Sequence, residues 1–279
     1  MSLTRRIEDF PIGNIPLWQH QQAALAQARL TVPDAPPLTL HPHAWLAAQD
    51  LTALAAAAAT TLTDEFLTPL AWRGAAPDPL RMLPAMASFL IRYPWDLLRA
   101  NEIHVAGLES APLEGEVHGL AVVEGILRLG PGSRILPGVF IEGNVVIGAN
   151  CRIGPNCYLR GNTSIGDECR IGQAVELKNS LVLSRTCVGH LSYVGDSVLG
   201  EAVNFGAGTL ISNFRHDGKS HRSMVGDRLV DTGRQKFGAI VGDHVHTGIH
   251  TTIYPGRKLW PHTLTRPAQI VQRDWHGDD

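Results

Sequence analysis

The chain has 279 residues, of which 44% are apolar and 18% charged, so it is not disordered and allows one large domain or two small ones. Its 24 Lys and Arg residues nearly balance its 26 Asp and Glu residues, and the net charge of −2 gives no reason to expect nucleic acid or an anionic membrane as a partner. We expect a cytoplasmic protein, because the start MSLTRRIEDF has no signal-peptide core and no apolar run is long enough to span a bilayer.

Residues 1–105 contain no internal repeat and predict a small α-rich region. The Ala-rich stretch from Ala44 to about Thr61 predicts a helix within it. Because the last coil of a solenoid exposes unpaired strand edges, we expect this region to cap the repeat that follows.

From Leu129 to Leu183 an aliphatic residue returns at every sixth position, a period that fits neither a helix nor simple strand alternation. The pattern slips by one residue after Leu183, resumes at Val188, and after an interruption runs from Val241 to Leu259. The motif [LIV]-Gly-x4 resembles the hexapeptide repeat of left-handed parallel β-helices, in which three six-residue sides make one coil. We therefore expect a mainly β protein, with the β-helix over residues 106–271 and a tail over 272–279.

Three of the four cysteines, Cys151, Cys157 and Cys169, lie two positions before an aliphatic residue, and Cys187 takes the same place when the six-residue period is continued. No CxxC motif is present, so we interpret them as small inward-facing residues rather than metal ligands or disulfides. Cys151, Cys169 and Cys187 are 18 residues apart and are expected to form an internal ladder.

The interruption at residues 212–238 is polar and rich in charge. Gly226 and Asp227 lie between RSMV and RLVD and predict the tip of a hairpin. We expect the insertion to project from the β-helix, as insertions in repeat proteins commonly do, and such loops often carry function.

Arg160 and Lys178 take the same repeat position one coil apart. Two stacked cations repel unless an anion lies close to them. Glu142, a further coil back, could pair with Arg160 in a surface ladder, or the two cations could bind a phosphate. Nearby, His190 and Glu176 could act as a general base and the carboxylate that orients it.

The stretch from His190 to Lys219, HLSYVGDSVLGEAVNFGAGTLISNFRHDGK, resembles the acetyltransferase domain of N-acetylglucosamine-1-phosphate uridyltransferase/glucosamine-1-phosphate acetyltransferase. The continuation GRQKFGAIVGDHVHTGIHTTIYPG is similar to the archaeal-type sugar-1-phosphate nucleotidylyltransferase/acetyltransferase branch. This resemblance covers roughly Arg152 to Gly256. It implies an N-acetyltransferase that uses acetyl-CoA as cosubstrate on an amino-sugar 1-phosphate, needs no metal, and forms homotrimers with sites between subunits.

The resemblance also implies residue roles. His190 would take the proton from the substrate amine and Glu176 would orient His190. Substrate binding would fall to Arg160, Lys178, Tyr193, Asn204, Asn213 and Lys219. Acetyl-CoA would lie against Ala207 and Ile249. The chain departs from the bacterial pattern in its Arg222 to Lys236 insertion and in shortened coils after Leu259.

Arg92 to Glu102, RYPWDLLRANE, resembles the connector between a sugar nucleotidyltransferase domain and its β-helix, and Pro11 to Gln21 is faintly similar to a segment of that domain. The glycine-rich loop that holds the triphosphate is absent, as are a P-loop and GxGxxG. Residues 1–105 are therefore expected to be a degenerate nucleotidyltransferase remnant without nucleotidyl transfer.

Histidines 244, 246 and 250 lie close together, but their spacing does not match the zinc carbonic anhydrases that share this fold, and we expect no metal site. The alternative to an acetyltransferase is a non-catalytic β-helix that binds sugar phosphates or nucleotides, or that regulates a partner nucleotidyltransferase. Binding of acetyl-CoA separates the two hypotheses.

Overall fold

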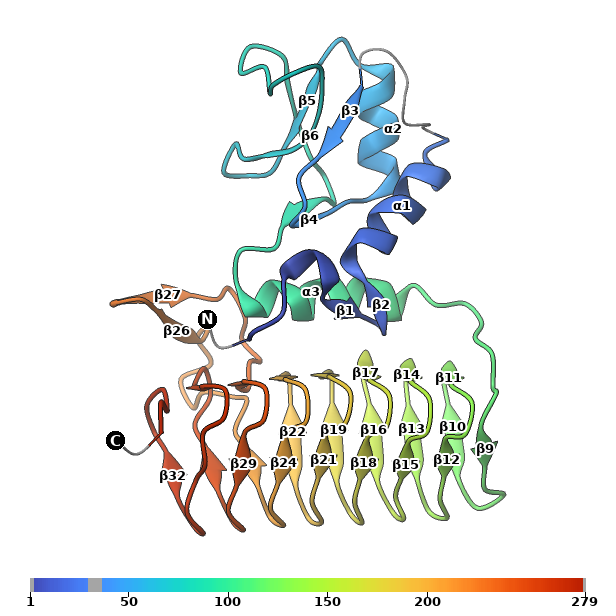
Figure 1. Cartoon of the computed structure of the whole chain (residues 1–279), viewed down its shortest axis with the longest axis vertical. Helices are drawn as coiled ribbons and strands as arrows, with labels where there is room; N and C mark the ends of the chain where they lie inside the picture. Colours follow the sequence, from blue (N-terminus) through green and yellow to red (C-terminus); the bar gives the residue numbers. More distant parts are fainter. Residues whose placement is uncertain (1–2, 30–36, 278–279) are drawn as a thin grey trace. The chain divides into compact units, whose positions relative to one another are not determined.

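The computed structural model describes residues 3–29 and 37–277, which form two compact units (Figure 1). The larger unit comprises residues 3–4, 12–14 and 97–277. The smaller comprises residues 5–11, 15–29 and 37–96. No helix among these described residues is both long enough and apolar enough to cross a lipid bilayer.

The smaller unit combines two helices with short strands around its own apolar core. Its helical elements are η1 (Ile7–Asp9), α1 (Leu17–Gln27) and α2 (Ala48–Ala56). A four-stranded sheet has the order β3 (Leu38–Leu40), β6 (Pro69–Arg73), β5 (Thr61–Thr63) and β7 (Met82–Pro84). Strand β4 (Ala44–Trp45) pairs with β8 (Phe89–Leu90). Strand β1 (Pro11–Ile12), whose Ile12 is counted with the larger unit, pairs with β2 (Ile15–Pro16). Leu51, Leu54, Leu62 and Leu70 are fully buried in the core of the smaller unit.

The Ala-rich helix is shorter than the sequence predicts. Ala44 begins β4 instead, which pairs with β8 and stacks Trp45 on Phe89. Thr61 begins β5, which pairs with β6 and β7. Partners brought by the tertiary structure override a local helical preference, so the region expected to be α-rich contains both helices and strands.

The larger unit is a parallel β-helix with three sides, one sheet to each side (Figure 1). The first sheet contains β10 (Val122–Glu124), β13 (Phe140–Glu142), β16 (Tyr158–Arg160), β19 (Glu176–Lys178), β22 (Tyr193–Gly195), β25 (Leu210–Ile211), β30 (Thr252–Ile253) and β32 (Ile270–Val271). The second contains β11 (Leu127–Leu129), β14 (Val145–Ile147), β17 (Thr163–Ile165), β20 (Leu181–Val182), β23 (Val198–Leu199), β28 (Ile240–Val241) and β31 (Lys258–Leu259). The third contains β9 (Glu116–Val117), β12 (Arg134–Ile135), β15 (Arg152–Ile153), β18 (Arg170–Ile171), β21 (Cys187–Val188), β24 (Asn204–Phe205) and β29 (His246–Thr247).

The predicted fold class, a mainly β β-helix of hexapeptide repeats, is confirmed. Successive coils stack in register, as Ile147 with Ile165 and Ile153 with Ile171 show. The repeating aliphatic side chains form one continuous buried core. The six-residue period therefore reflects one inward-facing aliphatic residue on each side of the triangle.

The limits of the β-helix unit differ from the predicted 106–271. Helix α3 (Pro94–Ala106) belongs to it from Leu97 onward, because the amide of buried Asn101 bonds to Ser164 Oγ at 2.7 Å and to the Asn162 carbonyl at 2.9 Å. At the other end, Trp275 pairs with Leu259 and donates its indole N–H to the Leu264 carbonyl at 2.9 Å. Residues 272–277 therefore close the last coil rather than form a separate tail.

The predicted cysteine ladder is correct for Cys151 and Cys169 and wrong for Cys187. Cys151 and Cys169 are buried and donate to the carbonyls of Gly166 and Leu183 at 3.0 and 3.2 Å. Cys187 is half-buried and lies in register with Arg170. The coil is one residue short between Lys178 and Leu181, and not after Leu183 as the sequence predicts, because Arg160 pairs with Lys178 whereas Ser164 pairs with Leu181. The inward position is therefore taken by fully buried Thr186. All four cysteines are free thiols, as expected.

This difference predicts unequal effects of cysteine substitution. Cys151→Ala and Cys169→Ala should each lower the free energy of unfolding by about 1–2 kcal/mol, because each empties space in a packed core. Cys187→Ala is the matched control and should cost less. Urea unfolding of the three variants makes the comparison.

Burial raises the pKa of the Cys157 thiol to about 11, so its alkylation in the native protein should be slow. Rapid alkylation of Cys151, Cys157 or Cys169 under native conditions would contradict their assignment to the core.

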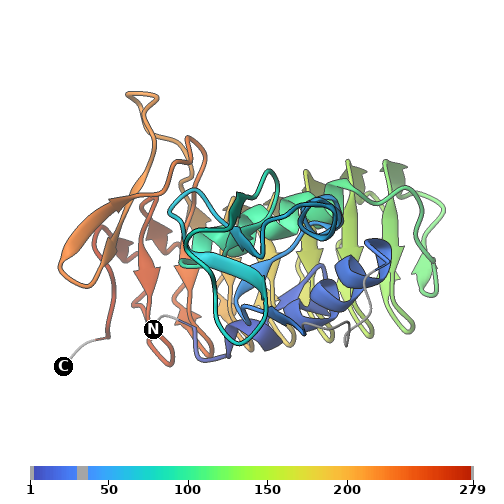
Figure 2. The same ribbon diagram turned by 90° about the horizontal axis from the view of Figure 1, so that it is seen from above.

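The insertion at residues 212–238 is an ordered part of the β-helix unit. Strands β26 (Arg222–Val225) and β27 (Arg228–Asp231) form the predicted hairpin, with Gly226 and Asp227 at its tip, and it projects from the β-helix (Figure 2). At its base, His221 is 2% exposed and its Nε2 lies 3.1 Å from the Asn213 carbonyl. Burial lowers the pKa of His221, so the ring is neutral at physiological pH.

The hairpin is also tied to the C-terminal coils. The ammonium group of buried Lys258 bonds to Ser223 Oγ at 3.3 Å and to the Met224 carbonyl. It also pairs with Asp274 at 2.8 Å. The hairpin is therefore held to the C-terminal coils through β26.

Candidate functional site

Three of the predicted substrate-binding residues, Arg160, Lys178 and Tyr193, lie on the first sheet, where β16, β19 and β22 stack. Arg160, Lys178 and Gly195 occupy one outward column of the register, and Glu176 lies in register with Tyr193 in the adjacent column. The period-two alternation of the strands turns both columns to the outer face. The sequence prediction that Arg160 and Lys178 stack one coil apart is thus correct.

Each of the two stacked cations has a carboxylate partner. Arg160 pairs with Glu176, with Nε at 2.8 Å and Nη2 at 2.7 Å from one carboxylate oxygen. Lys178 Nζ lies 2.9 Å from Asp196 Oδ2. Pairing offsets the repulsion between the stacked cations and leaves further N–H groups of both side chains for a ligand.

The alternative pairing of Arg160 with Glu142 is not found. Glu142 accepts a hydrogen bond from the Tyr158 hydroxyl instead. Arg160 turns toward the following coil, where Glu176 lies, and its guanidinium stands 5.2 Å from the centre of the Tyr158 ring. Arg160 therefore forms an ion pair, but with Glu176 and not with Glu142 as the surface-ladder hypothesis proposed.

Tyr193 and Asn213 form the next part of the site. The Asn213 amide nitrogen donates to the Tyr193 hydroxyl oxygen at 3.0 Å. Tyr193 reaches across Gly195, where an added Cβ would lie 2.5 Å from that oxygen, so only glycine leaves room for this contact. Burial, together with the charges of Glu176 and Asp196, raises the pKa of Tyr193, so the hydroxyl keeps its proton.

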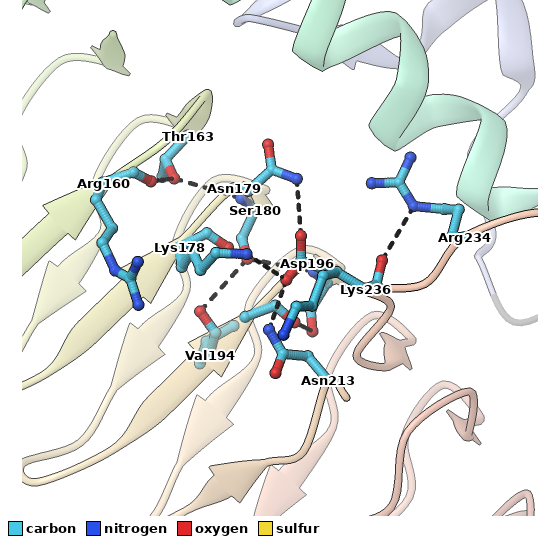
Figure 3. Close-up of polar contacts among 12 residues, drawn as sticks. Arg160, Thr163, Lys178, Asn179, Ser180, Val194, Asp196, Asn213, Arg234 and Lys236 are labelled. Atoms are coloured by element: carbon cyan, nitrogen blue, oxygen red, sulfur yellow. Dashed lines mark hydrogen bonds and ion pairs between the residues drawn. The ribbon is translucent and has the colours of Figure 1, made fainter. Parts of the chain in front are cut away.

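A chain of polar contacts continues behind Lys178 (Figure 3). Asn179 Nδ2 donates to Asp196 Oδ1 at 2.9 Å and to Glu102 Oε1 at 2.5 Å. Glu102, on α3, pairs with Arg234 of the insertion, whose Nη1 lies 3.1 Å from Oε2. The helix, the insertion and the site are therefore linked by consecutive hydrogen bonds.

His190 lies in a column at the corner between the third and first sheets. The register places Gln173, His190, Ala207 and Ile249 in successive coils of this corner. Ala207 and Ile249, which are predicted to contact acetyl-CoA, therefore lie in one line with His190. His190 and Ile249 are exposed, and the small Ala207 lies between them.

The contacts of His190 do not include Glu176. Gln173 donates its backbone N–H to His190 Nδ1 at 3.2 Å, while the Glu176 carboxylate pairs with Arg160. The neutral ring then carries its proton on Nε2. Nε2 can accept a proton only in the other tautomer, which requires the ring to release Gln173.

Two predicted site residues lie apart from this cluster. Asn204 is on β24 of the third sheet, in register with Cys187 and His246, whereas Arg160 and Lys178 are on the first sheet. Lys219 is exposed in the insertion, and only its backbone N–H has a described bond, to Asp217 at 3.2 Å. One chain therefore does not bring all eight predicted side chains together.

The sequence analysis missed Asp196, Asn179, Glu102 and Arg234. A signal for the first two was present in the repeat. In five successive coils, the residue directly after the Arg160 column forms a corner of the β-helix and has a positive φ. These corner residues are Gly125, Gly143, Gly161, Asn179 and Asp196. Glycine is replaced by polar residues in the two coils that adjoin the site.

Among residues 3–29 and 37–277, no three His, Cys, Asp or Glu side chains are arranged to hold a metal ion. His244 instead stacks on His262, with ring centres 4.8 Å apart.

Comparisons with known proteins find relatives of the β-helix. A protein-family model described as the GMPPB C-terminal domain matches residues 141–265. A bifunctional sugar-1-phosphate nucleotidylyltransferase/acetyltransferase of Sulfurisphaera tokodaii is 40% identical over 181 residues, 65% of this chain and 45% of the relative. A bifunctional protein GlmU of Methanococcus aeolicus is 36% identical over 185 residues, 66% of this chain and 44% of the relative.

The C-terminal part of the chain is homologous to these bifunctional proteins. The resemblance stated from the sequence is thus confirmed for that part. The chain spans less than half the length of these relatives. Among solved structures, the polySia-specific acetyltransferase NeuO matches with 16% identity and a TM-score of 0.28, over 61% of this chain and 77% of that chain.

Proposed function

We propose that this chain is an acetyl-CoA-dependent N-acetyltransferase that acts on an amino-sugar 1-phosphate. The observation that carries the proposal is the outward column of Arg160 and Lys178, with Tyr193 and Asn213 beside it and the His190 corner on the same coils. Homology to the sugar-1-phosphate nucleotidylyltransferase/acetyltransferases supports it. Nucleotidyl transfer is not part of the proposal.

The phosphate of the acceptor would lie against the Arg160 guanidinium and the Lys178 ammonium. Both cations keep N–H groups that Glu176 and Asp196 do not use, and charge-assisted hydrogen bonds to phosphate are among the strongest a protein offers. These contacts would orient the amine rather than take part in bond making.

Acetyl-CoA would lie along the corner column of Ala207 and Ile249. The amine nitrogen attacks the thioester carbonyl, a C–N bond forms, the C–S bond breaks, and CoA leaves as the thiolate, which becomes the thiol by taking up the proton that His190 has accepted. His190 accepts the proton that the amine loses, in the tautomer that has released Gln173, and the Ala207 backbone N–H would hold the developing oxyanion.

The direct test is release of free CoA thiol from acetyl-CoA with a panel of amino-sugar 1-phosphates and the corresponding dephosphorylated sugars. We expect turnover only with a phosphorylated amine. Binding of sugar phosphates without acetyl-CoA binding or turnover would favour the non-catalytic scaffold instead.

We further propose a homotrimer with sites shared between subunits. Asn204 lies on a different outer face from Arg160 and Lys178, and the faces of a three-sided helix point apart. Asn204 can bind the same sugar only if it comes from a neighbouring copy. Light scattering should give about three times the chain mass of 30.2 kDa, and a monomer at micromolar concentration would contradict the shared site.

Mixed trimers test the sharing itself. At acceptor concentrations below the wild-type KM, Asn204→Ala and Lys178→Ala should each be poorly active alone. Co-expressed, they should recover roughly a quarter of wild-type activity, because a random mixture pairs both intact residues at that fraction of interfaces. No recovery in verified mixed trimers would mean that both residues act within one chain.

A further inference from the structure

We propose that Asp196 is a positioning residue of this site, which sets the direction of the hydrogen bonds that Asn213, Tyr193 and Lys178 offer to the acceptor. The inference rests on the proposed function for the identity of the acceptor. Asp196 would act without touching the acceptor, by fixing which groups of the site donate hydrogen bonds and which accept them.

Asp196 is the hub of the polar cluster. Asp196 is 2% exposed, and its carboxylate accepts three hydrogen bonds. Oδ2 accepts from Lys178 Nζ at 2.9 Å and from Asn213 Nδ2 at 2.6 Å, and Oδ1 accepts from Asn179 Nδ2 at 2.9 Å. A buried carboxylate is costly unless its oxygens are satisfied, and here both are.

The carboxylate decides how the Asn213 amide is turned. An ionised carboxylate only accepts hydrogen bonds, so the NH2 group of Asn213 must face Asp196. Its second N–H is used by the Tyr193 hydroxyl oxygen at 3.0 Å. The amide oxygen of Asn213 therefore points away from Asp196, as Figure 3 shows, and is left to accept a hydrogen bond.

The orientation of the Asn213 amide in turn determines the direction of the Tyr193 hydroxyl proton. The Tyr193 hydroxyl oxygen already accepts from Asn213, so its own proton is directed outward to another acceptor. With Asp196 as the terminal acceptor, the site offers a Tyr193 O–H donor, the remaining Lys178 N–H donors, and an Asn213 oxygen acceptor. That set complements phosphoryl oxygens beside Lys178 and Tyr193 and a hydroxyl or ammonium group beside Asn213.

The backbone conformation at Asp196 suits an aspartate. Its φ is +49°, in the left-handed region, where three earlier coils have glycine at the equivalent corner. A side chain there carries a conformational cost that Asn and Asp tolerate best. The first coil without glycine at this corner has Asn179, and the next coil has Asp196. These two side chains are hydrogen-bonded to each other, and their coils also hold Lys178 and Tyr193.

Asp196→Asn tests the inference, because asparagine keeps the size and tolerates the same φ but can turn a donor toward Asn213. Calorimetric titration with inorganic phosphate and with glucosamine 1-phosphate should show affinity roughly 10- to 100-fold weaker than wild type. In turnover assays KM for the acceptor should rise more than kcat falls. Asp243→Asn is the matched control, since Asp243 is 6% exposed and accepts the Glu201 N–H at 2.8 Å, and it should bind as wild type.

A double-mutant cycle separates positioning from a merely structural role. If Asp196 acts by directing the Tyr193 hydroxyl, its loss should cost at least about threefold less affinity when Tyr193→Phe is already present. Should Asp196→Asn not fold, Asn213→Asp, which removes the donor that faces Asp196, should weaken binding to a similar extent.

Wild-type affinity in Asp196→Asn, additive losses in the cycle, or a wild type that binds neither probe would overturn the inference. Phosphate binding that depends on Asp196 without any acetyl transfer would instead leave the inference standing and refute the proposed function.

Discussion

His190→Ala should reduce acetyl transfer by about 10²- to 10⁴-fold, the usual cost of removing a general base. The loss should appear in kcat, because the proton leaves as the amine attacks and not when the acceptor binds. Single-turnover acetyl transfer at saturating acceptor measures it. Acetyl transfer that survives intact in His190→Ala would refute the proposed mechanism.

His118→Ala is a matched control. His118 is also exposed, and its Nδ1 accepts the Leu120 N–H at 3.1 Å, much as His190 Nδ1 accepts the Gln173 N–H at 3.2 Å. His118 lies in the first coil of the β-helix, several coils from the site. Its replacement by alanine should leave activity unchanged. Glu176→Ala should cost less than His190→Ala and should act mainly on acceptor KM, because Glu176 pairs with Arg160 rather than with His190.

Arg160→Ala and Lys178→Ala should each raise KM for a phosphorylated acceptor by roughly 10- to 100-fold, the worth of a hydrogen bond between charged groups. Turnover at saturation should change little, because these contacts exist already in the bound ground state. The dephosphorylated sugar should be a poor acceptor for the wild type, and its slow turnover should be nearly the same in both variants.

Arg134→Ala controls for the loss of an ion-paired arginine as such. Arg134 pairs with Glu116 at 2.9 Å, as Arg160 pairs with Glu176, but in the first coils. It should behave as wild type toward both acceptors. Equal use of phosphorylated and free sugar by the wild-type protein would remove the basis for a phosphate site.

The repeat made most of the β-helix predictable. Each coil needs one aliphatic residue inward on each of three sides, so the pattern is periodic and survives in the sequence by itself. The prediction failed at Cys187, where the coil is one residue short. Cys187 pairs there with Arg170 of the preceding coil, and Thr186 takes the inward position.

Residues 1–105 were less predictable for the same kind of reason. The Ala-rich stretch is a good local helix former, but β4 pairs with β8 some forty-five residues later, as the register of Ala44 with Leu90 shows. Pairing between distant segments leaves no periodic signature.

The sequence alone determined the repeat, the position of the hairpin, and the alignment of Arg160 with Lys178, because each follows from counting residues along regular coils. Only the tertiary structure decided the partners of those cations. Glu176 faces Arg160 rather than His190, and Asp196, Asn179 and Glu102 meet behind Lys178. Hydrogen bonds depend on the directions of side chains from a helix, an insertion and three coils at once, and no spacing within one segment encodes them.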